Sequence, residues 1–307
     1  MEKSNEEKFK FTQPFLKWVG GKQKFIEKIL EKFPKEIKNY HEIFLGGGSV
    51  LLGLIDYKNN NKINLTGKIF AYDYNKELIY VFKNIQNTPV ELFKELSLLR
   101  EEFINIKKEK QEEDYKKEER KRERKKYKNE DDRYTYDRKY VPKNLEEAVH
   151  DKESYYFWIR DKFNKMEEEN KLSIKGSAMF IFLNKTCFRG LYRVGPNGFN
   201  VPYGNYKNFN ISEEKYFKNI SKLIKDVEFI HCDFSKSIKR IKKNDFAYLD
   251  PPYAPEKKDS FTSYTGEGFN LDKHNELFKL CNELESKKFL MSNSNVDFVL
   301  NNFKDKK

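Results

Sequence analysis

A buried-strand run that ends in two prolines constrains the fold of this 307-residue chain more than any other feature. The run is Phe246-Ala247-Tyr248-Leu249, and Asp250-Pro251-Pro252-Tyr253 follows it directly. Proline lacks the backbone N–H that an interior strand must donate, so two prolines in succession end a central strand. The chain therefore turns here, and the turn fixes the Asp250 carboxylate and the Pro251 carbonyl as acceptors at the end of the strand. A purely structural turn with a capping aspartate is the alternative.

Two acceptors beside an aromatic ring suit a planar amino group on a nucleobase. Asp250 and the Pro251 carbonyl would each accept one amino hydrogen and so orient the nitrogen. The Tyr253 ring would hold the base by stacking on it. The turn thus predicts chemistry at an exocyclic amino group.

Strand and helix patterns alternate along the chain. Strands are expected over 40–45, 68–72, 227–232, 246–250 and 289–292, from short apolar runs. Helices are expected over 49–57, 75–84, 90–103, 154–168, 174–183, 235–241 and 272–285. The alternation predicts an α/β fold with a mostly parallel sheet and helices on both faces. Residues 184–206, rich in glycine, proline and asparagine, are expected to form a loop.

Three consecutive glycines, Gly46-Gly47-Gly48, follow the first expected strand and precede the helix that begins at Ser49. In open α/β sheets, ligands bind outside the carboxyl ends of the strands, where glycine lets a ligand approach the backbone. Asp73 ends the next expected strand, where a carboxylate commonly accepts hydrogen bonds from ribose hydroxyls. The spacing differs from that of dinucleotide sites, so a nucleoside such as S-adenosylmethionine fits better. A plain tight turn is the alternative.

Charge and cysteine content narrow the function classes. Lys and Arg number 61 against 49 Asp and Glu, which gives a net charge of +12. Such a surplus favours binding to polyanions, with nucleic acid first and anionic membranes second. The alternative explanation is that the whole proteome of the source is rich in lysine. No apolar run is long enough for a membrane span, and the polar N-terminus does not resemble a signal peptide. Cys187, Cys232 and Cys281 lie far apart, without zinc or disulfide spacing, which fits a reducing compartment.

Residues 107–139 differ from the rest of the chain. They contain 15 Lys or Arg and 11 Asp or Glu, and no Leu, Ile, Val, Phe or Met. Such a segment has no apolar face to bury, so it is expected to be a charged insertion, either a solvated helix or disordered. An arm that binds nucleic acid is a further alternative.

Taken in order, these motifs resemble the Dam-type DNA adenine methyltransferases, the alpha group of amino-methyltransferases. The resemblance runs from Pro14 to about Asn293. It includes the stretches 15–22, 42–49 and 250–253, and the recognition stretch 184–206, which is similar to that of enzymes that methylate adenine in GATC. It implies a Rossmann-like S-adenosylmethionine-dependent methyltransferase sheet with a smaller, mainly helical target-recognition domain.

The resemblance also implies roles for individual residues. The catalytic residues would be Asp250, Pro251, Pro252 and Tyr253. S-adenosylmethionine would be bound by Trp18, Lys22, Phe44, Gly46, Gly48, Ser49, Asp73, Asp233, Phe234 and Asp250. DNA would be recognised by Arg189, Leu191, Arg193 and Pro202. Arg193 would read a guanine, because an arginine fork pairs bidentately with that base in the major groove.

The resemblance divides the chain into four segments. Residues 1–106 and 216–307 would form the methyltransferase domain, 107–139 the charged insertion and 150–215 the target-recognition domain. The family pattern continues into another strand pair, so the last segment is expected to be truncated relative to it. Two residues depart from the pattern: Ile43 replaces a usual proline, and Arg189 replaces a common asparagine.

The expected reaction is methyl transfer from S-adenosylmethionine to the amino group of adenine in duplex DNA. The target base would flip out of the helix, and the transfer would be a direct displacement. Two alternatives are an adenine methyltransferase that acts on RNA and a catalytically silent, truncated DNA-binding protein. The expected partners are double-stranded DNA and a cognate restriction endonuclease, with no membrane and no metal. The expected location is the cytoplasm, at the nucleoid of a bacterium or in the host of a virus.

Overall fold

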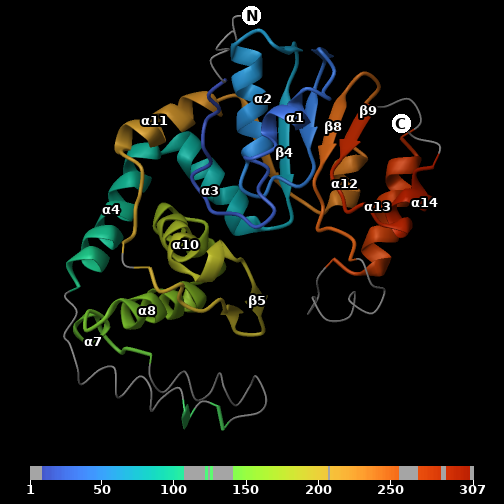
Figure 1. Ribbon diagram of the computed structural model, residues 1–307. Helices are drawn as coiled ribbons and strands as arrows, with labels where there is room; N and C mark the ends of the chain where they lie inside the picture. Colours follow the sequence, from blue (N-terminus) through green and yellow to red (C-terminus); the bar gives the residue numbers. More distant parts are fainter. Residues whose placement is uncertain are drawn as a thin grey trace, which may run out of the picture. The chain divides into compact units, whose positions relative to one another are not determined.

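The computed structural model describes residues 9–106, 122, 123, 125, 126, 141–206, 208–255, 269–284 and 288–304. The charged segment 107–139 that the sequence analysis singles out lies almost entirely outside these residues. Within the described residues, no helix combines the length and the apolar character that crossing a membrane requires. Figure 1 shows the course of the chain from the N-terminus to the C-terminus.

The chain forms two compact units. The first comprises Met1–Phe15, Gly20–Gln86 and Asn219–Lys307. The second comprises Leu16–Val19 and Asn87–Lys218. The first unit is therefore assembled from segments on both sides of the second in the sequence.

A five-stranded parallel sheet forms the centre of the first unit. Its strand order is β7 (Val227–His231), β4 (Ile69–Asp73), β2 (Tyr40–Glu42), β8 (Phe246–Leu249) and β9 (Lys288–Met291). The chain adds β4 and then β7 on one side of β2, and β8 and then β9 on the other side. The order therefore reverses between β2 and β8, and ligands of open α/β sheets bind at the carboxyl ends of the strands at such a switch point.

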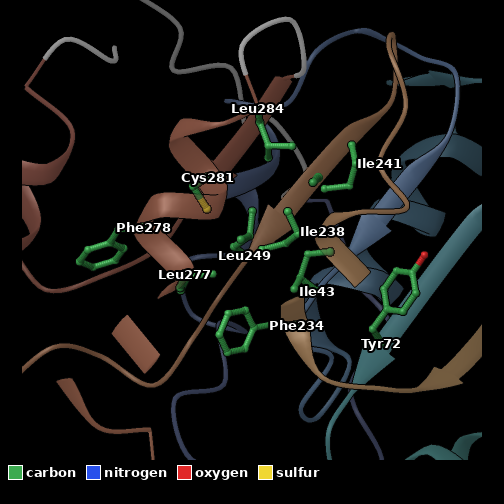
Figure 2. Close-up of a cluster of buried hydrophobic side chains, with 11 residues drawn as sticks. Ile43, Tyr72, Phe234, Ile238, Ile241, Leu249, Leu277, Phe278, Cys281 and Leu284 are labelled. Carbon is green, nitrogen blue, oxygen red and sulfur yellow. The ribbon is translucent and has the colours of Figure 1, made fainter. Parts of the chain in front are cut away.

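Helices cover both faces of this sheet. One face packs on α1 (Ile26–Leu30), α2 (Ser49–Asn59) and α3 (Lys76–Asn87), where the rings of Phe82 and Phe229 lie 5.1 Å apart. The other face packs on α12 (Phe234–Ile238) and α13 (Leu271–Asn282). Figure 2 shows Ile238 and Leu277 pointing into this second layer, beside Leu249 of β8. The sheet is thus buried on both sides, as expected for parallel strands.

The remaining elements of the first unit are small. Strands β1 (Glu36–Ile37) and β3 (Asn64–Leu65) pair with each other in parallel, apart from the main sheet. Helix α14 (Asp297–Asn302) follows β9, and its Phe298 packs against the cluster drawn in Figure 2. Helix α11 (Glu214–Leu223) contains the boundary between the two units.

The second unit is mainly helical. It contains α4 (Pro89–Asn105), α7 (Leu145–Ala148), α8 (Lys152–Lys165), α9 (Glu168–Lys171), α10 (Ile174–Thr186) and the 3-10 helix η1 (Phe188–Gly190). Helix α10 is buried along most of its length and packs against α4 and α8. A hairpin of β5 (Val194–Gly195) and β6 (Gly198–Phe199) follows η1.

The α/β fold and the central sheet expected from the sequence are confirmed, and the expected helices appear with shifted ends. The stretch 184–206 differs from expectation, because it contains the last turn of α10, η1 and the hairpin rather than loop alone. Strand β2 ends at Glu42, three residues before the expected end. The Ile43 N–H still donates to the Tyr248 carbonyl at 3.0 Å, and the Leu45 N–H donates to the Tyr72 carbonyl at 2.8 Å. Helix α4 is part of the second unit, although the sequence analysis grouped it with the methyltransferase segment.

A buried histidine on α13 predicts how stability depends on pH. His274 is 1% exposed, and burial lowers its pKa from 6.5 to about 4. The unfolded chain therefore binds a proton below pH 6.5 that the folded protein does not bind until about pH 4. Folding stability from this site is complete above pH 6.5 and falls as the pH drops. Between pH 7.5 and pH 5 we expect a loss of about 2 kcal/mol from His274 alone.

Urea unfolding at the two pH values measures this loss. His274→Leu should show a smaller drop in unfolding free energy than the wild type, by about 2 kcal/mol. The control is His150→Leu, at an exposed position, which should behave as the wild type does. Equal drops in all three proteins would contradict the prediction.

Candidate active site

The glycine loop between β2 and α2 adopts a conformation that favours glycine. Gly46 and Gly48 have φ angles of 51° and 74°, in the left-handed region. A Cβ atom on Gly48 would also lie 2.8 Å from the Phe82 ring. Any other residue at this position would therefore be strained and would collide with α3. The loop brings backbone to the carboxyl end of β2, as the sequence predicts.

Asp73, at the end of β4, holds the glycine loop in place. Its Oδ2 accepts a hydrogen bond from the Gly46 N–H at 2.9 Å, and its Oδ1 accepts one from the Asn75 N–H at 2.9 Å. Burial raises the pKa of this carboxyl group, and the backbone N–H groups oppose the rise. Each carboxylate oxygen keeps a lone pair for another donor. Asp73 therefore supports the loop and retains the capacity to accept ribose hydroxyls.

Glu42, the last residue of β2, is a buried carboxyl group that sequence reasoning assigned only to a motif. It is 2% exposed and accepts a hydrogen bond from the Tyr40 hydroxyl at 2.8 Å. Burial raises its pKa to about 8, the charge of Asp250 adds to the rise, and a backbone hydrogen bond from Leu51 opposes it. Leu51 belongs to the first turn of α2, whose cap residue Gly48 has no side chain to satisfy that turn. Glu42 takes over part of this capping.

Asp250, directly after β8, forms an ion pair with Lys22. The Lys22 Nζ lies 2.5 Å from Asp250 Oδ2, and the two side chains are only 11% and 19% exposed. The same ammonium donates to the Gly20 carbonyl and lies 5.0 Å from the centre of the Tyr253 ring. Burial raises the pKa of Asp250, whereas Lys22 and the Tyr253 hydroxyl oppose the rise. The structure thus brings together three residues that the sequence analysis assigned to the site.

The second carboxylate oxygen of Asp250 has a different environment. Oδ1 is buried and has no hydrogen-bond partner within the described part of the chain. A buried acceptor without a donor costs about 1–3 kcal/mol, so the site favours a ligand that brings a donor. The Tyr253 side chain is 47% exposed, which leaves its ring accessible to a planar ligand. An amino group on an aromatic base meets both conditions.

Residues after β9 hold the Asp250 turn, and sequence reasoning missed them. The Asn293 Oδ1 accepts a hydrogen bond from the Ala254 N–H at 3.0 Å, and the Ser294 hydroxyl donates to the Ala254 carbonyl. Ser292 lies 2.7 Å from the Tyr248 hydroxyl, measured between the two side-chain oxygens. A run of small polar residues directly after the last strand was the available signal. These residues can reach the Asp250 turn only because β9 pairs with β8.

Three further residues expected to bind the cofactor, Phe44, Asp233 and Phe234, come from the loop after β2 and the start of α12. The Asp233 carboxylate caps α12 through the Ser235 N–H at 2.9 Å. Phe234 is 5% exposed, and its ring centre lies 5.9 Å from that of Phe44. Tyr74, which follows Asp73, is 77% exposed and was not singled out from the sequence. Binding of a cofactor by these residues stays a prediction.

The residues expected to read DNA lie in the second unit, on η1 and around the hairpin. Arg189 is exposed and has a φ of 56°, Leu191 is half-buried and Pro202 is exposed. Arg193 donates from Nε to Asn200 Oδ1 at 2.7 Å and from Nη2 to the Asn200 carbonyl at 3.2 Å. Asn200 thus orients the guanidinium group, a role that sequence reasoning did not assign.

Trp18 is a predicted cofactor residue that the structure assigns to the second unit. Its ring stacks on Tyr192, with ring centres 6.0 Å apart and planes at 22°. Lys22 belongs to the first unit. Contact between Trp18 and a cofactor stays a prediction.

Comparisons with known proteins agree with these motifs. The family model for D12 class N6 adenine-specific DNA methyltransferases matches residues 18–139 and 124–307. A type II methyltransferase of Methanocaldococcus jannaschii is 38% identical over 297 residues, which are 94% of this chain and 86% of that protein. A type II methyltransferase of Lactococcus lactis is 28% identical over 299 residues, 95% of this chain and 85% of that protein. A DNA adenine methylase of Haemophilus influenzae is 30% identical over 294 residues, 94% of this chain and 81% of that protein.

The ion pair predicts a measurable shift in the titration of Asp250. Because Lys22 opposes the rise that burial causes, Lys22→Met should raise the Asp250 pKa further. NMR of carbon-13-labelled aspartate side chains would follow the titration, with the Asp250→Asn variant to assign the signal. Lys24→Met, at an exposed position two residues away, is the matched control and should leave the titration unchanged. An unshifted pKa in Lys22→Met would contradict this account of the pair.

Proposed function

Because this chain belongs to the D12 class of N6 adenine-specific DNA methyltransferases, we propose that it methylates adenine within GATC in duplex DNA. The class uses S-adenosylmethionine as its methyl donor. The observation that best supports this chemistry is the buried Oδ1 of Asp250, an acceptor without a donor beside the accessible Tyr253 ring. It stands at the carboxyl end of β8, next to the strand that leads into the glycine loop.

The proposed chemistry begins with base flipping, because the amino group of adenine is otherwise enclosed in the base pair. Tyr253 would stack on the flipped ring. Asp250 Oδ1 and the Pro251 carbonyl would each accept one amino hydrogen, which directs the nitrogen lone pair toward the methyl group. Bound S-adenosylmethionine would supply that methyl group, whose S–C bond would break as the N–C bond forms. The methylated nitrogen would then release its surplus proton to solvent. Alignment of the two reactants in one site provides much of the acceleration.

Lys22 and Asp250 would have distinct tasks in this scheme. Lys22 favours the ionised form of Asp250 and fixes the position of the carboxylate through the contact at 2.5 Å. Asp250 would orient the amine rather than remove its proton beforehand, because the amino nitrogen becomes acidic only after methylation. Asp73 and the N–H groups of the glycine loop are the residues that fit the nucleoside part of the cofactor.

Specificity for GATC would come from the recognition stretch in the second unit. The Nε side of Arg193 is occupied by Asn200, so the guanidinium group keeps its outer fork for another acceptor pair. A guanine offers such a pair through O6 and N7. Leu191 could add an apolar contact, and Pro202 would shape the loop. Arg189, in place of an asparagine, would alter the preference at one flank of the site.

The names of the relatives favour a role in restriction and modification. Two of them are called type II methyltransferases, and another is called a DNA adenine methylase. We therefore propose that methylation by this chain protects DNA from a restriction endonuclease with the same target. Plasmid DNA recovered from cells that express the chain should resist nucleases that cut only unmethylated GATC. Complete cleavage of that plasmid would exclude the protective role at this sequence.

The mechanism predicts that Asp250→Ala separates catalysis from cofactor binding. Methyl transfer should fall about 100-fold or more, since the amine loses its orientation. Affinity for S-adenosylmethionine, measured by calorimetry, should stay within about tenfold, because the carboxylate is proposed to contact the target amine. Asp226→Ala, an exposed aspartate before β7, is the control and should leave both quantities unchanged. Wild-type turnover in Asp250→Ala would refute the mechanism.

The target assignment predicts where methylated adenines occur. The chain would be expressed in a host without its own adenine methylation, and modified adenines on a plasmid would be mapped by sequencing. Wild-type protein should mark GATC, and modification elsewhere would remove the GATC assignment while leaving the methyltransferase assignment intact. Arg193→Ala should lose discrimination at one G·C pair by about 1–3 kcal/mol, roughly 5-fold to 150-fold. The exposed Lys215→Ala controls for the lost charge and should keep the target.

A further inference from the structure

Basic side chains gather where the central strands of the first unit begin. The first residues of β2, β4 and β8 lie side by side, in the register Ile69, Tyr40 and Phe246. The segments leading into these strands carry Lys38, Lys68, Lys239, Arg240, Lys242 and Lys243, all of which are exposed. We call these six residues the basic edge. It lies at the amino ends of the strands, whereas Asp250 lies at the carboxyl end of β8.

Asn39 ties the three segments together. Its Oδ1 accepts a hydrogen bond from the Lys68 N–H at 2.8 Å, and its carbonyl accepts one from the Phe246 N–H at 2.9 Å. Its Nδ2 donates to Asp245 Oδ1 at 2.8 Å. The backbone positions of the basic edge are therefore fixed relative to one another by hydrogen bonds on one asparagine.

The nearby carboxylates do not neutralise most of these cations. Asp245 is 2% exposed, and its Oδ2 lies 3.0 Å from the His41 Nε2 and accepts the Lys242 N–H at 2.9 Å. Glu228 pairs with Lys68 at 2.6 Å. Within the described residues, no ion pair involves the other members, which are Lys38, Lys239, Arg240, Lys242 and Lys243.

The hydrophobic core anchors the part of the basic edge that precedes β8. Ile238 and Ile241 are each 2% exposed, and Figure 2 shows both in the cluster of buried side chains that also contains Leu277 of α13. The exposed cations at 239, 240, 242 and 243 flank these anchors in the sequence. Neighbouring strands are about 4.8 Å apart, so β4 and β8, with β2 between them, begin within about 10 Å of each other. That distance is comparable to the Debye length at physiological salt, so the like charges repel, and a polyanion would relieve the repulsion.

We infer that the basic edge binds the phosphate backbone of a second segment of double-stranded DNA, separate from the segment presented to Asp250. Duplex DNA carries one negative charge per about 1.7 Å of its axis, which matches a compact group of cations better than isolated anions do. The inference concerns a surface that the proposed methylation does not use.

The test compares two triple variants of the full chain. In the first, Lys239, Lys242 and Lys243 are each changed to Gln, and in the second the same three are each changed to Arg, which keeps the charge. Arg240 is left intact because it interacts with the buried Tyr72 and His41. The protein is first saturated with a short GATC duplex, and a labelled duplex without GATC is then titrated in at about 50 mM salt.

Binding of the labelled duplex to saturated wild-type protein, with two duplexes per chain by sedimentation, supports the inference. The Gln variant should bind the second duplex at least about tenfold more weakly. The slope of its log binding constant against log salt concentration should become shallower by up to about 0.9 for each lost phosphate contact. The Arg variant should behave as the wild type does, and all three proteins should bind the first duplex equally. One duplex per wild-type chain, an unchanged Gln variant, or an Arg variant as weak as the Gln variant would overturn the inference. Preference for an RNA duplex of the same length would overturn the choice of partner.

Failure of this test is distinct from failure of the proposed function. The second duplex is detected by binding alone, so its signal does not depend on methyl transfer or on GATC specificity. A protein that methylates GATC but binds one duplex would retain the proposed function and lose the second surface. A protein that binds two duplexes and methylates another sequence would retain the second surface and lose the proposed GATC target.

Discussion

The parallel pairing of β2 with β8 is the interaction on which the candidate site depends. Because the two strands run in the same direction and in register, the segments that leave their carboxyl ends emerge side by side. One of these segments is the glycine loop, and the other is the turn that begins with Asp250. The chain reverses its order of adding strands between β2 and β8, so the connections on the two sides lead away from this point in opposite directions. The glycine loop and the Asp250 carboxylate therefore adjoin without any special local sequence.

Buried carboxyl groups then determine the local geometry at this edge. Asp73 and Glu42 come from neighbouring strands, and each accepts a backbone hydrogen bond from the segment between β2 and the first turn of α2. Glu42 and Asp250 differ in their environment, because burial raises the pKa of Glu42 to about 8, whereas Lys22 opposes the rise that burial causes in the pKa of Asp250. Near neutral pH, Glu42 is therefore mostly protonated.

Much of this arrangement could be predicted from the amino-acid sequence, for reasons that are local. The prolines after Asp250 force a turn wherever the strand lies, and three consecutive glycines mark a close approach of backbone in any α/β sheet. The remaining features depend on which segments become neighbours. The bond from Ala254 to Asn293 requires β9 to lie beside β8, and the bond from Arg193 to Asn200 requires the hairpin to form. No spacing in the sequence reveals such partners, because hydrogen bonds between distant residues leave no periodic pattern.

The bond between Ala254 and Asn293 also bears on how the protein matures during synthesis. The turn after β8 leaves the ribosome well before the residues that complete its hydrogen bonds, which lie 39 positions further along the chain. Until β9 has emerged and paired, the backbone next to Tyr253 lacks the side chains that hold it. A nascent chain can therefore expose its glycine loop, its Lys22 and its Asp250 without a finished site among them.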